Sequence, residues 1–195
     1  LRETDATGVE ISDVMRLPGG GAGMYLAVLD GQGELHVAVA DMRAADATDP
    51  SYFDRLRGRL ARSSLIVADT NLPVGSLQRI LDIAGDAAVP VILEPVSAQK
   101  AEKLTDLSGE VFAVTPNEAE APVLARAPGS LHIAHTVVTR GAAGAMWTDH
   151  AAQTTEEVGA EECRVRDVTG AGDAFVAGFV LGLLAAASEG AAERD

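Results

Sequence analysis

The sequence predicts an α/β fold in which helices flank a mainly parallel central sheet. Short apolar runs alternate with segments of helical periodicity, the pattern of βαβ units. Polar residues follow several of these runs, and open α/β sheets bind ligands beyond the carboxyl ends of their strands. With 195 residues, 20 glycines and 47% hydrophobic residues, the chain fits one domain with a substantial core.

Apolar runs bounded by turn residues predict the strands, and apolar residues three and four positions apart predict the helices. Asp30-Gly31-Gln32-Gly33, between two apolar runs, indicates a hairpin turn. Leu77, Ile80, Leu81 and Ala84 share one helical face. The expected strands are 24–29, 35–40, 64–68, 89–93, 111–114, 136–139 and 145–148, the last antiparallel to its predecessor; the expected helices are 76–84, a short one near 118, and 174–184.

We expect residues 8–45 to form edge strands, residues 60–190 the α/β core, and residues 186–195 a fraying, polar tail. The apolar stretch 174–187 is short for a bilayer span and rich in Ala and Gly, which favours a buried helix and no membrane partner. A net charge of −14 argues against binding of a nucleic acid polymer, which needs clustered Lys and Arg. Cys163 is the only cysteine, which fits a reducing, cytoplasmic location.

The most informative segment runs from Asp167 to Phe175 and contains Gly170-Ala171-Gly172-Asp173 directly before an apolar helix. A helix start offers unpaired N–H groups and the positive end of the helix dipole, which together bind anions. Beside a bound phosphate, the carboxylate of Asp173 is a candidate general base for an attacking hydroxyl. The alternative is an ordinary N-cap on a buried helix.

Two further segments precede it. Asn117 and Glu120 lie three residues apart after a predicted strand, where an amide and a carboxylate can hold Mg²⁺ through water. A solvated acidic helix start explains the same residues equally well. Thr139-Arg140-Gly141-Ala142-Ala143-Gly144 lets the backbone bend closely around a ligand, with Arg140 as a source of positive charge, although a plain β-turn is the simpler alternative.

In this order, the three segments resemble the ribokinase-like (PfkB) family of sugar and nucleoside kinases. The resemblance implies that residues 8–45 form a small β lid with edge strands and that residues 60–190 form the nucleotide-binding core. The resemblance implies that Asp173 deprotonates the acceptor hydroxyl and that the amides of Gly170, Ala171 and Gly172 hold the transferring phosphoryl group. It also implies ATP and Mg²⁺ as cofactors, with a monovalent cation such as K⁺ as a further one. On this basis Asn117 and Glu120 organise the metal, whereas Thr139, Arg140, Gly141 and Gly144 surround the nucleotide.

Residues 93–97, Leu-Glu-Pro-Val-Ser, followed by Lys100, resemble the pseudouridine kinases within that family, as do residues 24–41 and 68–72. This implies phosphorylation of the 5′-hydroxyl of pseudouridine. Candidate substrate residues are Glu94, Lys100, Asp69 and Asn71. The alternatives are a related kinase of ribose, fructose or another nucleoside, and a non-catalytic nucleotide-binding fragment.

The sequence departs from the family in extent. It contains no recognisable Gly-Gly-Asn-type substrate motif, and the family continues with helices beyond the one expected at 174–184. We therefore expect a single, incomplete kinase domain over residues 1–195. The expected partner is a small-molecule nucleoside or sugar, and a homodimer would match relatives that associate through the lid.

Overall fold

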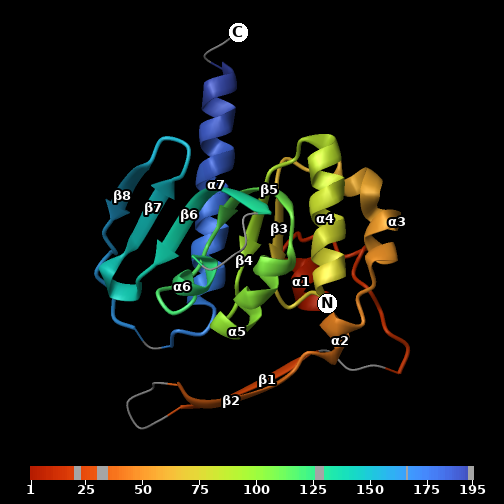
Figure 1. Cartoon of the computed structure of the whole chain (residues 1–195). Helices are drawn as coiled ribbons and strands as arrows, with labels where there is room; N and C mark the ends of the chain where they lie inside the picture. Colours follow the sequence, from red (N-terminus) through yellow and green to blue (C-terminus); the bar gives the residue numbers. More distant parts are fainter. Residues whose placement is uncertain (20–22, 30–34, 126–129, 166, 193–195) are drawn as a thin grey trace.

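The computed structural model describes residues 1–19, 23–29, 35–125, 130–165 and 167–192. A six-stranded sheet with the order β3-β4-β5-β6-β7-β8 forms its centre (Figure 1). Strands β3 to β6 are parallel, and β7 and β8 continue the sheet in antiparallel fashion, as the sequence predicts for β7. The strands are β3 Ile66–Asp69, β4 Val91–Glu94, β5 Gly109–Val114, β6 Leu131–Thr139, β7 Ala145–Asp149 and β8 Thr154–Val158.

Helices α3 (Pro50–Leu60) and α4 (Val74–Ala87) pack together against one face of the sheet. Helix α3 begins where the Asp49 side chain accepts a hydrogen bond from the Ser51 amide at 2.8 Å and Pro occupies the first helical position. Alternate strand residues meet the apolar stripe of α4. The core contains Phe53, Ile66, Ala68, Leu77, Ile80, Leu81, Ala84, Val91, Leu93 and Val111.

Helix α7 (Ala171–Ala192) lies over the opposite face and extends past the sheet toward the C-terminus (Figure 1). The prediction of a buried helix is wrong: Val176 is buried with 8% of its surface exposed, but Leu181 is 69% exposed. The helix is apolar on all sides, and the described residues cover only one side. The tail expected from 186 is helical as far as Ala192, and residues 193–195 lie outside the described residues.

Helix α7 corrects the estimate of apolar length as well. Among the described residues, one helical segment, Ala171–Glu189, is long and apolar enough to cross a membrane, judged by its length and composition alone. The sequence-based estimate counted 174–187 alone and missed the helical turn that the glycine-rich segment adds.

Strands β1 (Met24–Leu29) and β2 (Leu35–Asp41) form an antiparallel ribbon that projects away from the sheet (Figure 1). Both match the predicted lid strands, whereas the predicted turn at 30–33 lies outside the described residues. The helix expected near 118 begins at Ala121. The remaining short helices are α1 Arg2–Ala6, α2 Arg43–Asp46, α5 Ala98–Ala101, η1 Glu102–Asp106, α6 Ala121–Leu124 and η2 Gly141–Ala143.

Candidate active site

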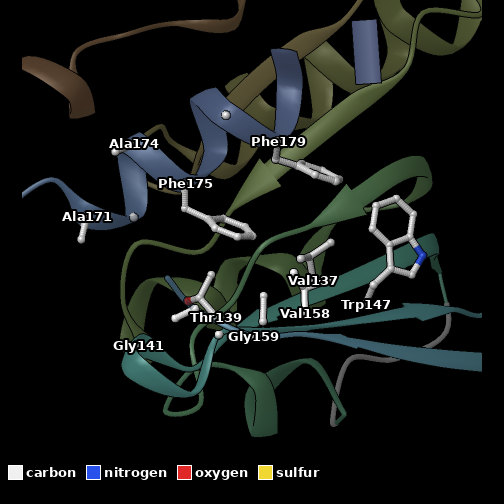
Figure 2. Close-up of a pocket in the computed structure, with 15 residues that line it drawn as sticks. Val137, Thr139, Gly141, Trp147, Val158, Gly159, Ala171, Ala174, Phe175 and Phe179 are labelled. Atoms are coloured by element: carbon white, nitrogen blue, oxygen red, sulfur yellow. The ribbon is translucent and has the colours of Figure 1, made fainter. Parts of the chain in front are cut away.

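Two cavities lie on the α7 side of the sheet and meet at the first turn of α7. The first, of about 600 Å³, lies between α7 and strands β6, β7 and the end of β8 (Figure 2). The second, of about 820 Å³, lies between α7, the carboxyl ends of strands β3 to β6 and the lid. Both are lined by Thr139, Gly172 and Phe175, so a ligand in one cavity would reach a ligand in the other at this point.

The first cavity is mostly apolar. Phe175 and Phe179 point from α7 toward Val137 and Trp147 (Figure 2). The ring centroids of Trp147 and Phe179 are 5.3 Å apart, and those of Phe175 and Phe179 are 6.4 Å apart. Aromatic and aliphatic walls of this kind accept a flat, apolar group such as a nucleotide base.

The predicted glycine-rich loop forms one edge of the first cavity. Thr139 and Gly141 line it, and the Thr139 amide donates to the Pro116 carbonyl at 2.9 Å. Gly144 has φ +85°, and a Cβ there would lie 1.9 Å from the Val158 carbonyl oxygen, so only glycine fits. Arg140 does not line either cavity, because its guanidinium pairs with the Glu157 carboxylate at 3.2 Å.

The start of α7 presents free backbone donors at the junction of the two cavities. Gly170, with φ +78°, turns the chain into the helix. The Ala171 amide donates to the Val168 carbonyl at 3.1 Å, so it is already engaged. Within the described part of the chain, the amides of Gly172 and Asp173 have no protein acceptor. Together with the helix dipole, they can bind an anion at the place where the cavities meet.

Asp173 lines the second cavity, and its side chain is exposed there. No protein group among the described residues forms a hydrogen bond with its carboxylate. A carboxylate that is free to accept a proton, next to amides that bind anions, is suited to general-base chemistry on a hydroxyl group.

Asn117 and Glu120 form a reciprocal cap before α6. The Glu120 carboxylate accepts from the Asn117 amide and side-chain N–H, each at 2.9 Å, while Asn117 Oδ1 accepts from the Glu120 amide at 3.0 Å. Glu120 is only 3% exposed, so the start of this helix is not the solvated one that the simpler alternative predicts.

Asn117 and Glu120 can hold a metal ion through its water ligands. Each Glu120 oxygen accepts one protein hydrogen bond and keeps acceptor capacity toward the second cavity, which both residues line. Among the described residues, no cluster of three or more His, Cys, Asp or Glu side chains forms a direct metal site. The residues therefore fit Mg²⁺ held through water, which suits a metal that retains its hydration shell.

Three predicted substrate residues, Asp69, Asn71 and Glu94, line the second cavity. Burial raises the pKa of the Glu94 carboxyl above its usual value; the hydrogen bond from Thr115 Oγ1, at 2.5 Å, acts in the opposite direction. The negative charges of Glu120 and Asp173 raise this pKa further. Perturbed carboxyl groups in a cavity are typical of functional sites.

Lys100, the fourth predicted substrate residue, does not line the second cavity. Its ammonium group binds Asn71 Oδ1 instead, so it acts on the cavity through Asn71. Sequence reasoning missed Lys103, which donates to the carbonyls of Thr70 and Leu72 at 2.8 and 2.9 Å. It also missed Thr115, although its place directly after β5 is the same signal that identified Asp69 and Glu94.

Known proteins are similar to this chain over most of its length. The model of the pfkB family of carbohydrate kinases matches residues 1–193. Pseudouridine kinase of Escherichia coli is 32% identical over 193 residues, which cover 92% of this chain and 61% of that protein. The chain thus spans about three-fifths of that relative's length.

Solved structures share the fold. A Clostridium perfringens protein assigned as a sugar kinase is 29% identical, with a TM-score of 0.74 over 94% of this chain and 62% of that one. Ribokinase of Giardia lamblia, 19% identical, has a TM-score of 0.63 over 79% of this chain and 52% of that one. The predicted ribokinase-like α/β fold is therefore confirmed.

Proposed function

This chain belongs to the pfkB family of carbohydrate kinases, and we propose that it transfers the γ-phosphoryl group of ATP to the 5′-hydroxyl of a nucleoside, with pseudouridine as the acceptor. Two cavities meet at Gly172, one almost wholly apolar and one that also contains carboxylate and amide side chains, and this meeting is the observation that carries the proposal. The first cavity suits a nucleotide base, and the polar side chains of the second suit an acceptor rich in hydroxyl groups. Phosphoryl transfer requires that the two ligands meet end to end.

In this reaction Asp173 accepts the proton of the acceptor hydroxyl as its oxygen attacks the γ-phosphorus. The bond between phosphorus and the β–γ bridging oxygen breaks, and ADP leaves. The amides of Gly172 and Asp173 stabilise the negative oxygens of the transferring group, helped by the dipole of α7. These interactions provide positioning and charge stabilisation, which account for most of the catalysis in phosphoryl transfer.

Magnesium is the expected counter-charge. No Lys or Arg is found among the described residues that line the two cavities. When bound, Mg²⁺ neutralises the phosphate oxygens. Glu120 and Asn117 would hold its water ligands, and their mutual hydrogen bonds fix both side chains in place.

The choice of a nucleoside acceptor rests on the lining of the second cavity and on the likeness to the E. coli pseudouridine kinase. Asp69, Asn71 and Glu94 supply acceptors and donors for ribose hydroxyls and for the polar edge of a base. Lys100 fixes the Asn71 side chain rather than the substrate. Ribose, fructose and uridine are the competing acceptors.

The test is an acceptor panel. The purified chain is incubated with ATP and Mg²⁺ and with pseudouridine, uridine, ribose or fructose in turn, and the products are followed by ³¹P NMR and mass spectrometry. The proposal predicts pseudouridine 5′-phosphate with the highest kcat/KM. Faster transfer to another acceptor would contradict the assignment of pseudouridine, and ATP binding without transfer to any acceptor would contradict kinase activity.

A further inference from the structure

Val96 has an unusual backbone conformation at the edge of the second cavity. Its φ is +64°, a region that β-branched residues rarely occupy. The Ser97 amide donates to the Pro95 carbonyl at 2.7 Å, which closes a three-residue ring around Val96. A positive φ with this hydrogen bond marks a classic γ-turn, a rare and strained form. Such outliers persist only where the surroundings impose them, and they cluster at functional sites.

Thr70 holds this turn in place. It is completely buried, its amide donates to the Glu94 carbonyl at 3.0 Å, and its Oγ1 donates to the Pro95 carbonyl at 2.5 Å. The Pro95 carbonyl thus accepts from both Thr70 and Ser97, and its orientation is fixed. Lys103 in turn binds the Thr70 carbonyl at 2.8 Å, so hydrogen bonds join the loops after β3 and β4.

The turn places an apolar group among carboxylates. Val96 is 37% exposed and lines the second cavity together with exposed Val67 and Tyr25. Directly beside it, Glu94 Oε1 lies 3.5 Å from the Val96 amide nitrogen. A nucleoside has a flat face for the apolar wall and hydroxyl groups for the carboxylates, whereas a free sugar lacks the flat face.

We infer that Val96 is a specificity-determining residue that selects a nucleoside over a free sugar, and that Thr70 is the positioning residue that maintains the γ-turn. This inference rests on the proposed function. The side chain of Val96 packs against the base of the acceptor, so it acts on acceptor binding and not on the nucleotide. Glycine would adopt this positive φ without strain, but it would leave a gap where the side chain of Val96 contacts the base. The need for that side chain is the reason that the strain at Val96 is tolerated.

The experiment compares Val96→Gly with Ala88→Gly. Ala88 also has a positive φ, +53°, but it is an exposed residue at the end of α4 and lines neither cavity. Both variants release backbone strain, and only Val96→Gly changes the proposed site. We expect Val96→Gly to lower kcat/KM for pseudouridine about tenfold or more, because missing methylene groups weaken an apolar pocket by such factors. The KM for ATP and the kcat/KM for ribose stay within twofold, and Ala88→Gly behaves like the parent chain.

Thr70→Val tests the positioning residue, since it removes the hydroxyl group with little change of shape. It should lower the ratio of kcat/KM for pseudouridine to kcat/KM for ribose, as Val96→Gly does. Thr70→Ser, which keeps the hydroxyl group, should have the ratio of the parent chain. If Val96→Gly folds, as verified by circular dichroism, and has the same ratio of kcat/KM values as the parent chain, the inference is overturned. The result for Val96→Gly decides even if Thr70→Val does not fold.

If the parent chain transfers phosphate to no acceptor, the proposed function fails, and saturation-transfer NMR with pseudouridine then decides this inference separately. Binding that weakens at least tenfold in Val96→Gly and not in Ala88→Gly supports the nucleoside subsite. Equal binding in the three proteins, or no binding to any, overturns it.

Discussion

Replacement of Gly144 by Ala tests how tightly the glycine-rich loop fits against the end of β8. A Cβ at this position would lie 1.9 Å from the Val158 carbonyl oxygen and 2.9 Å from the Ala160 nitrogen. The backbone, with φ 85° and ψ −136°, is in a region almost restricted to glycine. The strained conformation costs about 1–3 kcal/mol. Forcing an extra carbon into a packed region costs about another 1–3 kcal/mol.

We therefore expect Gly144→Ala to lower the free energy of unfolding by about 2–6 kcal/mol, the two costs taken together. For a domain of this size that corresponds to a fall of about 4–24 °C in Tm. Gly141→Ala is the matched control: Gly141 has φ +54°, and nothing lies within 4 Å of the added Cβ. Its expected cost is only the left-handed strain of about 1–2 kcal/mol.

Urea unfolding followed by circular dichroism measures both variants under the same conditions. The free energy of unfolding should fall more in Gly144→Ala than in Gly141→Ala. Equal losses in the two variants would refute the close contact between the loop and Val158, and with it the shape of the first cavity.

Two other predictions concern Glu94 and α7. Because burial raises the pKa of the Glu94 carboxyl above its usual value, the folded chain binds more protons than the unfolded chain at pH values just above that usual pKa, and this contribution to stability falls as pH rises. The stability of Glu94→Gln relative to the parent should therefore be greater at pH 7.5 than at pH 5 in urea unfolding, and a difference independent of pH would contradict the raised pKa. Leu181→Ser, at the exposed Leu181, should change the free energy of unfolding by less than about 0.5 kcal/mol and reduce self-association in light scattering, whereas Val176→Ser, at the buried Val176, should cost about 1–3 kcal/mol. Equal stability losses in the two α7 variants would contradict the described packing of the helix.

The sequence identified the strands and the main motifs because these features are local. Apolar runs and the residues that end them predict β3 to β7, and the observed boundaries differ mainly by a few residues at the strand starts. Strand β8 (Thr154–Val158) was not predicted, because all its residues are exposed and its sequence does not alternate between apolar and polar residues. Helix α3 was not predicted for a similar reason, since Phe53 is its one buried residue and its apolar stripe is narrow.

The features that sequence reasoning could not predict depend on contacts between distant residues. The γ-turn at Val96 is held by Thr70, whose hydroxyl group reaches a carbonyl 25 positions further along the chain. Arg140 pairs with Glu157 on a strand that was not predicted, and it lines neither cavity. The burial of α7 was wrongly predicted because an apolar sequence shows what a helix could bury, not what the chain provides to cover it.

The most direct test of the central claim is the turnover of Asp173→Asn beside Asp167→Asn, measured with ATP, Mg²⁺ and the acceptor that the parent chain uses best. Asp167 is an equally exposed carboxylate six positions earlier, whose Oδ1 accepts from the Thr169 amide at 2.8 Å and which lines neither cavity. We expect Asp173→Asn to lower kcat by about 10²–10⁴-fold, with the Kd for ATP within threefold of the parent, because a general base contributes that much to catalysis. Asp167→Asn should keep the parent's kcat. A kcat for Asp173→Asn within tenfold of the parent would contradict the assignment of Asp173 as the base at the junction of the two cavities.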